Sequence, residues 1–134
     1  MHKYLEPVSG SLYRVVVDIK VNVGPFAMVE IPEGTLTNLG TIPKQLHWLI
    51  KPDDEDMFYA FLVHDVLVGE FREPFKVHIS NYLYDEERVM YAAVSSWDQA
   101  NEIMRTVARM CGAPAWKRQL CYLAIKVYGY VRKV

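Results

Sequence analysis

The N-terminal third of the chain has the spacing of polar and apolar residues that is typical of a β-hairpin. Residues 12–23 are rich in valine and partly alternate between apolar and polar side chains, as in a strand with one buried face. Residues 22–25 form a turn sequence, and residues 26–31 form the returning strand. Pro32 and Gly34 then end this strand, because proline lacks a backbone N–H and glycine tolerates turn conformations.

Beyond the hairpin, apolar residues recur at helical spacing in segments bounded by proline or glycine. Pro43 and Pro114 lie at expected helix starts, where a missing N–H costs nothing. Gly69 and Gly112 lie just after expected helix ends, and residues 96–99 have the form of a capping box. The expected helices cover residues 43–50, 52–68, 96–112 and 114–129.

Further signals refine this layout. Asp53 and Asp54 are expected in the first turn of the helix at 52–68, where they complement its dipole. Residues 70–94 are the least regular segment, interrupted by Pro74 and Asn81, so we expect an irregular insertion there, with a short strand pair at 75–84. The last helix has an apolar face composed of Trp116, Leu120, Leu123, Ala124 and Val127.

These elements predict the fold class. We expect an α+β fold in which an N-terminal β-hairpin packs on a small bundle of about four helices, within a single domain covering residues 1–134. A chain of 134 residues with 51% hydrophobic residues can bury its own core without disulfides or metal. Cys111 and Cys121 lie in apolar helical segments, which favours reduced thiols.

The N-terminus has no signal-peptide pattern, and no run approaches the roughly twenty apolar residues that span a bilayer. We therefore expect a soluble cytoplasmic protein without a membrane partner. Net charge is −1, but it is unevenly distributed: seven basic and no acidic residues follow position 104, whereas the first 104 residues carry −8. This split indicates either a surface for an anionic partner or a contact, within the molecule, between the basic C-terminal helices and the acidic residues 53–56 and 85–87. We favour the contact within the molecule.

Two sequence blocks carry a resemblance to a known family. Residues 29–43 contain a strand followed by a Pro-Glu-Gly turn and end in Thr-Ile-Pro, and His64-Asp65 follows about twenty residues later within an apolar helical run. From Glu30 to Gly129 the chain resembles the bacteriophage and prophage domain-of-unknown-function family thirteen fifty-three. The resemblance implies a phage origin and a fold, but no agreed activity.

The family pattern implies that a loop Thr-Asp, the helical His-Asp and a later Ala-Asp converge as a carboxylate and imidazole cluster. Such a cluster has ligand chemistry for a divalent metal, or could serve as a general base. Here the loop and later-helix aspartates are replaced by Asn38 and Asn101, and Trp97 stands where the family often has arginine. Amides bind hard cations weakly and cannot act as bases.

We therefore interpret Asn38, His64, Asp65 and Asn101 as a buried hydrogen-bond network, with a binding pocket or retained catalysis as the alternatives. His64 and Asp65 are adjacent, so about 100° of helix rotation separates their directions. No catalytic residue, metal ligand or cofactor is assigned. The chain also lacks a phosphate-binding glycine loop, a Gly-x-Ser-x-Gly elbow and a Cys-x-x-Cys pair.

A second set of residues suits binding to another protein. Tryptophan, tyrosine and arginine are enriched at the energetic centres of protein interfaces. A nucleic-acid role would need the C-terminal basic residues on one face beside exposed tyrosines, and the near-zero net charge argues against it. The candidate partner-binding residues are Trp48, Trp116, Tyr128, Tyr130, Arg132 and Lys133.

The sequence thus predicts a phage-encoded, non-catalytic protein that binds a phage or host protein. We expect a virion component, such as a tail or neck accessory, in the host cytoplasm or incorporated in the virion. An oligomer within such an assembly is compatible with this role. The alternatives are a divergent metal-dependent hydrolase-like protein that uses His64 and Asp65, or a factor against host defence.

Overall fold

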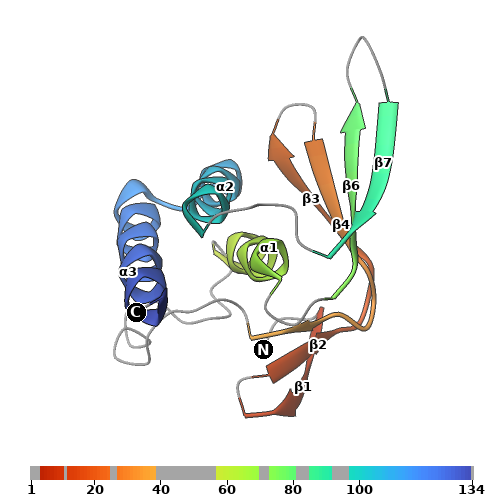
Figure 1. Ribbon diagram of the computed structural model, residues 1–134, viewed down its shortest axis with the longest axis horizontal. Coiled ribbons are helices and arrows are strands. Elements are labelled where there is room, and N and C mark those ends of the chain that lie inside the picture. The colour runs from red at the N-terminus through yellow and green to blue at the C-terminus, as the bar shows by residue number, and fades with distance from the viewer. Residues whose placement is uncertain are drawn as a thin grey trace.

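The computed structural model describes residues 4–10, 12–24, 27–38, 57–69, 73–80, 85–91 and 97–133, without the side chains of Trp97 and of residues 128–133. Within these ranges the chain forms seven strands and three helices (Figure 1). The strands are β1 (Leu5–Ser9), β2 (Leu12–Val15), β3 (Ile19–Gly24), β4 (Ala27–Ile31), β5 (Leu36–Thr37), β6 (Phe75–Ser80) and β7 (Asp85–Met90). The helices are α1 (Phe58–Val68), α2 (Trp97–Met110) and α3 (Ala115–Lys133).

The strands form two antiparallel sheets around one buried helix. One sheet has the order β1-β2-β5 and the other the order β3-β4-β6-β7. Helix α1 lies at the centre, α2 packs against it and against β3, and α3 packs on α2 at the side far from the larger sheet (Figure 1). The mixed α+β class is therefore confirmed, with three helices in the described residues rather than about four.

The predicted β-hairpin is present, but its first strand is divided. β3 and β4 pair in antiparallel register, with Val21 opposite Val29. The residues before them form β2 instead, whose partners are β1 and β5. The division is caused by the loop after β4: the Val15 N–H donates to the Thr35 carbonyl, and Asp18 accepts a 2.7 Å hydrogen bond from the backbone N–H of Glu33.

Residues 75–90 are more regular than expected. β6 and β7 form a hairpin of two six-residue strands, and β6 pairs with β4, so that the segment extends the larger sheet. The expectation of an irregular insertion is wrong for these residues. Pairing of β6 with β4 is the physical reason. Phe75, Val77 and Ile79 alternate with polar residues along β6, but the partner strand lies far away in the sequence.

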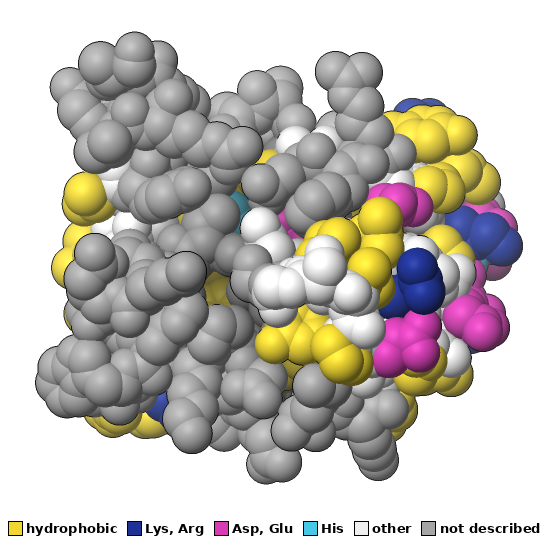
Figure 2. All heavy atoms as spheres, turned by 90° about the horizontal axis from the view of Figure 1, so that it is seen from below, with side chains coloured by type: hydrophobic (Ala, Val, Ile, Leu, Met, Phe, Trp, Pro, Cys, Tyr) yellow, Lys and Arg dark blue, Asp and Glu magenta, His cyan; other side chains and the backbone are white. Residues whose placement is uncertain are grey.

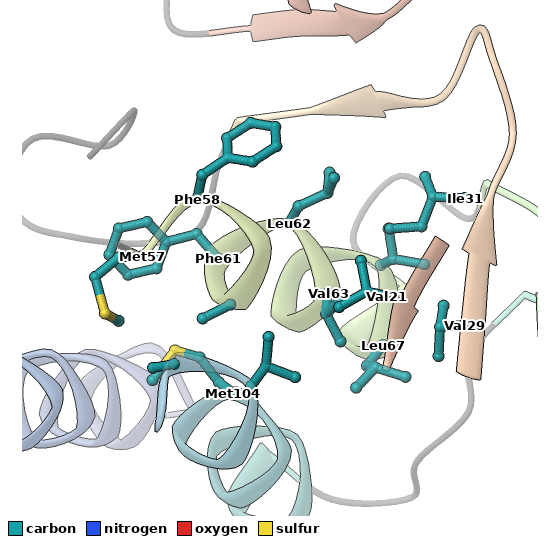
Figure 3. Close-up of a cluster of buried hydrophobic side chains, with 14 of the residues drawn as sticks. Val21, Val29, Ile31, Met57, Phe58, Phe61, Leu62, Val63, Leu67 and Met104 are labelled. Carbon is teal, nitrogen blue, oxygen red and sulfur yellow. The ribbon is translucent and has the colours of Figure 1, made fainter. Parts of the chain in front are cut away.

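Helix α1 is apolar on every side because it is surrounded by protein. Nine of its eleven residues are buried, as expected for a helix in the middle of a domain. Its side chains meet the larger sheet on one side, where Leu67 points toward Val29 (Figure 3). On the other side α1 packs against α2, which contributes Met104 to the same buried core. This core positions the two polar residues of the helix, His64 and Asp65.

The ends of α1 were only partly predicted. Gly69 ends the helix with φ of 67°, as expected for a glycine that accepts the left-handed conformation. The start is later than predicted, because Met57 is the N-cap and the first turn contains no acidic residue. Asp53 and Asp54 lie outside the described residues, as does the expected helix at 43–50.

A tight turn makes α2 and α3 neighbours. Gly112 has φ of 85°, its N–H donates to the Arg109 carbonyl, and the Ala113 N–H donates to the Ala108 carbonyl. These two hydrogen bonds form a Schellman motif, and Pro114 then precedes the first turn of the next helix. α3 continues through Gly129 to Lys133, so its predicted end was too early.

The described helices include none that is both long enough and apolar enough to cross a membrane. Cys111 is exposed and Cys121 is buried.

Candidate functional site

His64 and Asn101 form a buried pair between α1 and α2. The His64 Nε2 atom lies 2.7 Å from Asn101 Oδ1, and both side chains are fully buried. An amide oxygen only accepts, so the imidazole donates this hydrogen bond from Nε2. A neutral His64 ring therefore carries its lone pair on Nδ1.

Asp65 forms a second buried contact on another side of α1. Its Oδ2 atom accepts a 2.6 Å hydrogen bond from Thr37 Oγ1 and a 3.3 Å hydrogen bond from the backbone N–H of Asn38. The Thr37 side chain is fully buried and that of Asp65 nearly so. This contact joins α1 to β5.

The four predicted polar residues thus form two separate contacts in the described structure. Since adjacent residues point about 100° apart on a helix, His64 reaches α2 while Asp65 reaches β5. Asn38 takes part through its backbone N–H. The arrangement links α2 and β5 through α1, and buried polar contacts of this kind specify how packed elements align.

Thr37 is the member of this site that the sequence did not reveal. It is buried at the end of β5 and donates a 2.6 Å hydrogen bond to Asp65. Its position one residue before Asn38, within the loop motif that contains threonine, is the feature of the sequence that could have identified it. Threonine is common in strands and turns, so residue type alone did not distinguish it.

The face of α3 that was expected to be apolar is largely exposed. Among the described side chains of α3, Cys121 and Ile125 are buried in the core. Trp116, Leu123 and Val127 are 54%, 47% and 62% exposed. The predicted partner-binding residue Trp116 is therefore accessible. Trp48 and the side chains of Tyr128, Tyr130, Arg132 and Lys133 lie outside the described part.

Acidic residues of β7 pair with their own sheet. Glu87 lies 3.8 Å from Lys76 and 3.1 Å from His78, and Glu86 pairs with Arg88. On the strand side of the molecule, basic and acidic side chains lie beside one another (Figure 2). The predicted pairing of residues 85–87 with the C-terminal helices is therefore wrong, because α3 packs on α2 instead. The acidic residues 53–56 lie outside the described residues.

Among the residues that the structure describes, no three His, Cys, Asp or Glu side chains are grouped so that they could hold a metal ion. His78 lies between two glutamates, 3.5 Å from Glu30 and 3.1 Å from Glu87. This contact is an ion pair when the imidazole is protonated.

The fold and its polar contacts define a small α+β protein organised around one buried helix that bears His-Asp. The chain matches the family model described as "Protein of unknown function (DUF1353)" over residues 13–125. It belongs to this family, as its sequence motifs predicted. No curated protein and no solved structure matches the chain.

Proposed function

We propose that this protein is non-catalytic and acts by docking another protein on the exposed apolar row of α3. The row consists of Trp116, Leu120, Leu123 and Val127. The exposure of three of these residues in a helix that already packs in the core through Cys121 and Ile125 is the observation that carries the proposal. Contiguous exposed apolar surface of this kind is typical of interaction sites.

The spacing of the row identifies the kind of partner. Intervals of four, three and four residues between positions 116 and 127 place the side chains on one helical seam, as in a coiled coil. An amphipathic helix of the partner can lie along such a seam. Lys117 and Lys126 flank the row, so the partner helix carries acidic residues beside its apolar face.

The His-Asp pair of α1 supports the non-catalytic part of the proposal. His64 and Asp65 are buried and contact α2 and β5 respectively. A catalytic base must come within hydrogen-bond distance of a substrate proton. Because His64 and Asp65 are buried between packed elements, their positions suit a structural contact better than contact with a substrate.

The biological setting follows from the family resemblance alone. We propose that the chain is encoded by a phage or prophage and that its partner is a phage or host protein. A virion accessory role, in the tail or neck, fits a small protein that has one docking helix. In such an assembly the protein would be present in several copies.

Two matched variants test the docking surface. Val127→Glu places a charge in the row, whereas Val89→Glu makes the same change on β7, where the valine is 61% exposed. The purified proteins are used to capture partners from a lysate of phage-producing cells. We expect Val127→Glu to reduce recovery of a wild-type partner at least about tenfold, because a charge is buried against apolar surface.

Val89→Glu should recover the same partner at the wild-type level. Both variants should keep the circular dichroism spectrum and melting temperature of the wild type, since surface changes usually stay within about 0.5 kcal/mol. Equal recovery by all three proteins would show that α3 is not the docking surface.

A further inference from the structure

The turn between α2 and α3 creates a pocket that is separate from the His-Asp contacts and from the apolar row. Its volume is about 420 Å³, within the range of sites for small molecules. Six of its seven lining residues are polar or charged, and three of them are arginines. The lining residues are Glu102, Arg105, Thr106, Arg109, Ala115, Arg118 and Gln119.

The helix geometry explains why three arginines meet here. Arg105 and Arg109 lie four residues apart on α2, and so project from the same face. Arg118 comes from the first turns of α3, which the Schellman motif at Gly112 folds back beside the end of α2. Like charges four residues apart destabilise a helix slightly, so this grouping is not explained by helix stability.

Glu102, the one acidic residue among the described lining residues, is already engaged. Glu102 accepts a 2.8 Å hydrogen bond from the Tyr122 hydroxyl and lies 3.8 Å from Arg105. Arg105 also stacks over the Tyr122 ring at 4.7 Å and donates to Gln119. Arg105 is thereby held in place while its charge is offset by Glu102.

Arg109 and Arg118 differ from Arg105. Neither forms an ion pair with an acidic residue among the described parts of the chain. Three arginines against one glutamate give the described lining of the pocket a formal charge of +2. Ala115, the first residue of α3, also lines it, so the positive end of the helix dipole adds to this charge.

We infer that this pocket binds the oligophosphate group of a small molecule. Arginine presents a planar fork that pairs with phosphate oxygens through two hydrogen bonds. A carboxylate is planar and is satisfied by one such fork, whereas a phosphate presents oxygens in several directions. Guanidinium groups from two helices therefore suit phosphate better, and the +2 charge suits an anion with two or more charges.

This inference does not depend on the docking function. Arg118 and Gln119 face the pocket, whereas Val127 belongs to the exposed row two to three turns away on α3. Val127→Glu should therefore leave phosphate binding unchanged. Failure of one proposal leaves the other intact.

Titration calorimetry on the full chain tests the inference, with inorganic pyrophosphate as the probe at constant ionic strength. We expect one site in the wild type, with orthophosphate binding more weakly because it carries less charge. Replacing both Arg109→Gln and Arg118→Gln should lower pyrophosphate affinity at least about tenfold, since two charge-assisted contacts are lost. Arg88→Gln is the matched control, because it removes one exposed arginine from β7.

Absence of pyrophosphate binding at millimolar concentration would overturn the inference. Equal loss in Arg88→Gln would also overturn it, because the effect would then reflect overall charge. Tighter binding of a hexaglutamate peptide than of pyrophosphate would assign the pocket to an acidic protein segment instead. If the double variant does not fold, Arg118→Lys replaces it. That variant keeps the charge but loses the fork, and unchanged affinity would contradict the proposed recognition.

Discussion

Removing the Asn101 amide tests whether the His64 contact stabilises the fold. In Asn101→Ala, the buried Nε2–H of His64 loses the acceptor that lies 2.7 Å away. Loss of a buried hydrogen-bond partner costs roughly 1–3 kcal/mol. For a chain of 134 residues, this corresponds to a decrease in melting temperature of about 3–12 °C.

Urea unfolding followed by tryptophan fluorescence measures this effect, and an unchanged m-value would show that the unfolding transition exposes the same surface. A double-mutant cycle with His64→Phe isolates the contact from the change in side-chain volume. We expect a coupling energy of about 0.5–3 kcal/mol between the two positions. His64→Ala should lower stability in the same direction.

Arg109→Ala is the control, because it truncates an exposed side chain on the same helix. Its stability should remain within about 0.5 kcal/mol of the wild type. Asn101→Ala with wild-type stability, or a cycle without measurable coupling, would refute the structural role of this contact.

Two further changes test neighbouring contacts. Thr37→Val removes the hydroxyl that donates to Asp65 at 2.6 Å, and urea unfolding should show a loss of roughly 1–3 kcal/mol that Thr37→Ser partly restores; equal stability of Thr37→Val and wild type would exclude this contribution. The pKa of Tyr122 is raised above 10.0. The largest cause is the hydrogen bond that Tyr122 donates to Glu102, and burial and the negative charge of Glu102 contribute less. This contribution to stability is present below pH 10 and is lost as pH rises through the folded-state pKa. Tyr122→Phe should therefore flatten the alkaline decrease in melting temperature, and an unchanged pH profile would contradict the assignment.

Local signals in the sequence predicted several features correctly. The hairpin of β3 and β4 follows from short-range alternation and a turn sequence. Gly69 and Gly112 were recognised as helix ends because glycine accepts positive φ. The separate directions of His64 and Asp65 follow from the rotation of about 100° per residue.

Features that depend on distant parts of the chain were not predicted. The division between β2 and β3 depends on hydrogen bonds from the later loop, such as that between Glu33 and Asp18. The β6–β7 hairpin is stabilised by pairing with β4, which lies far away in the sequence, and β7 is mostly charged, so its own residues do not mark it as a strand. Thr37 contacts a residue 28 positions later, so only the fold identifies it as a partner of Asp65.

The face of α3 that packs in the core was not predicted from hydrophobic periodicity. The helix has apolar residues on more than one side, and periodicity favoured the row at Trp116, Leu123 and Val127. The structure buries Cys121 and Ile125 instead. Hydrophobic periodicity identifies an amphipathic helix, but it cannot choose which of two apolar faces packs in the core.

Site-specific photo-crosslinking in phage-producing cells tests the central proposal most directly. A photoreactive phenylalanine analogue placed at position 127 lies in the exposed row of α3, and at position 89 it lies on β7 at nearly equal exposure. We expect a discrete crosslinked partner from position 127 and none from position 89. A partner that crosslinks from position 89 alone, or equally from both positions, would contradict docking through α3.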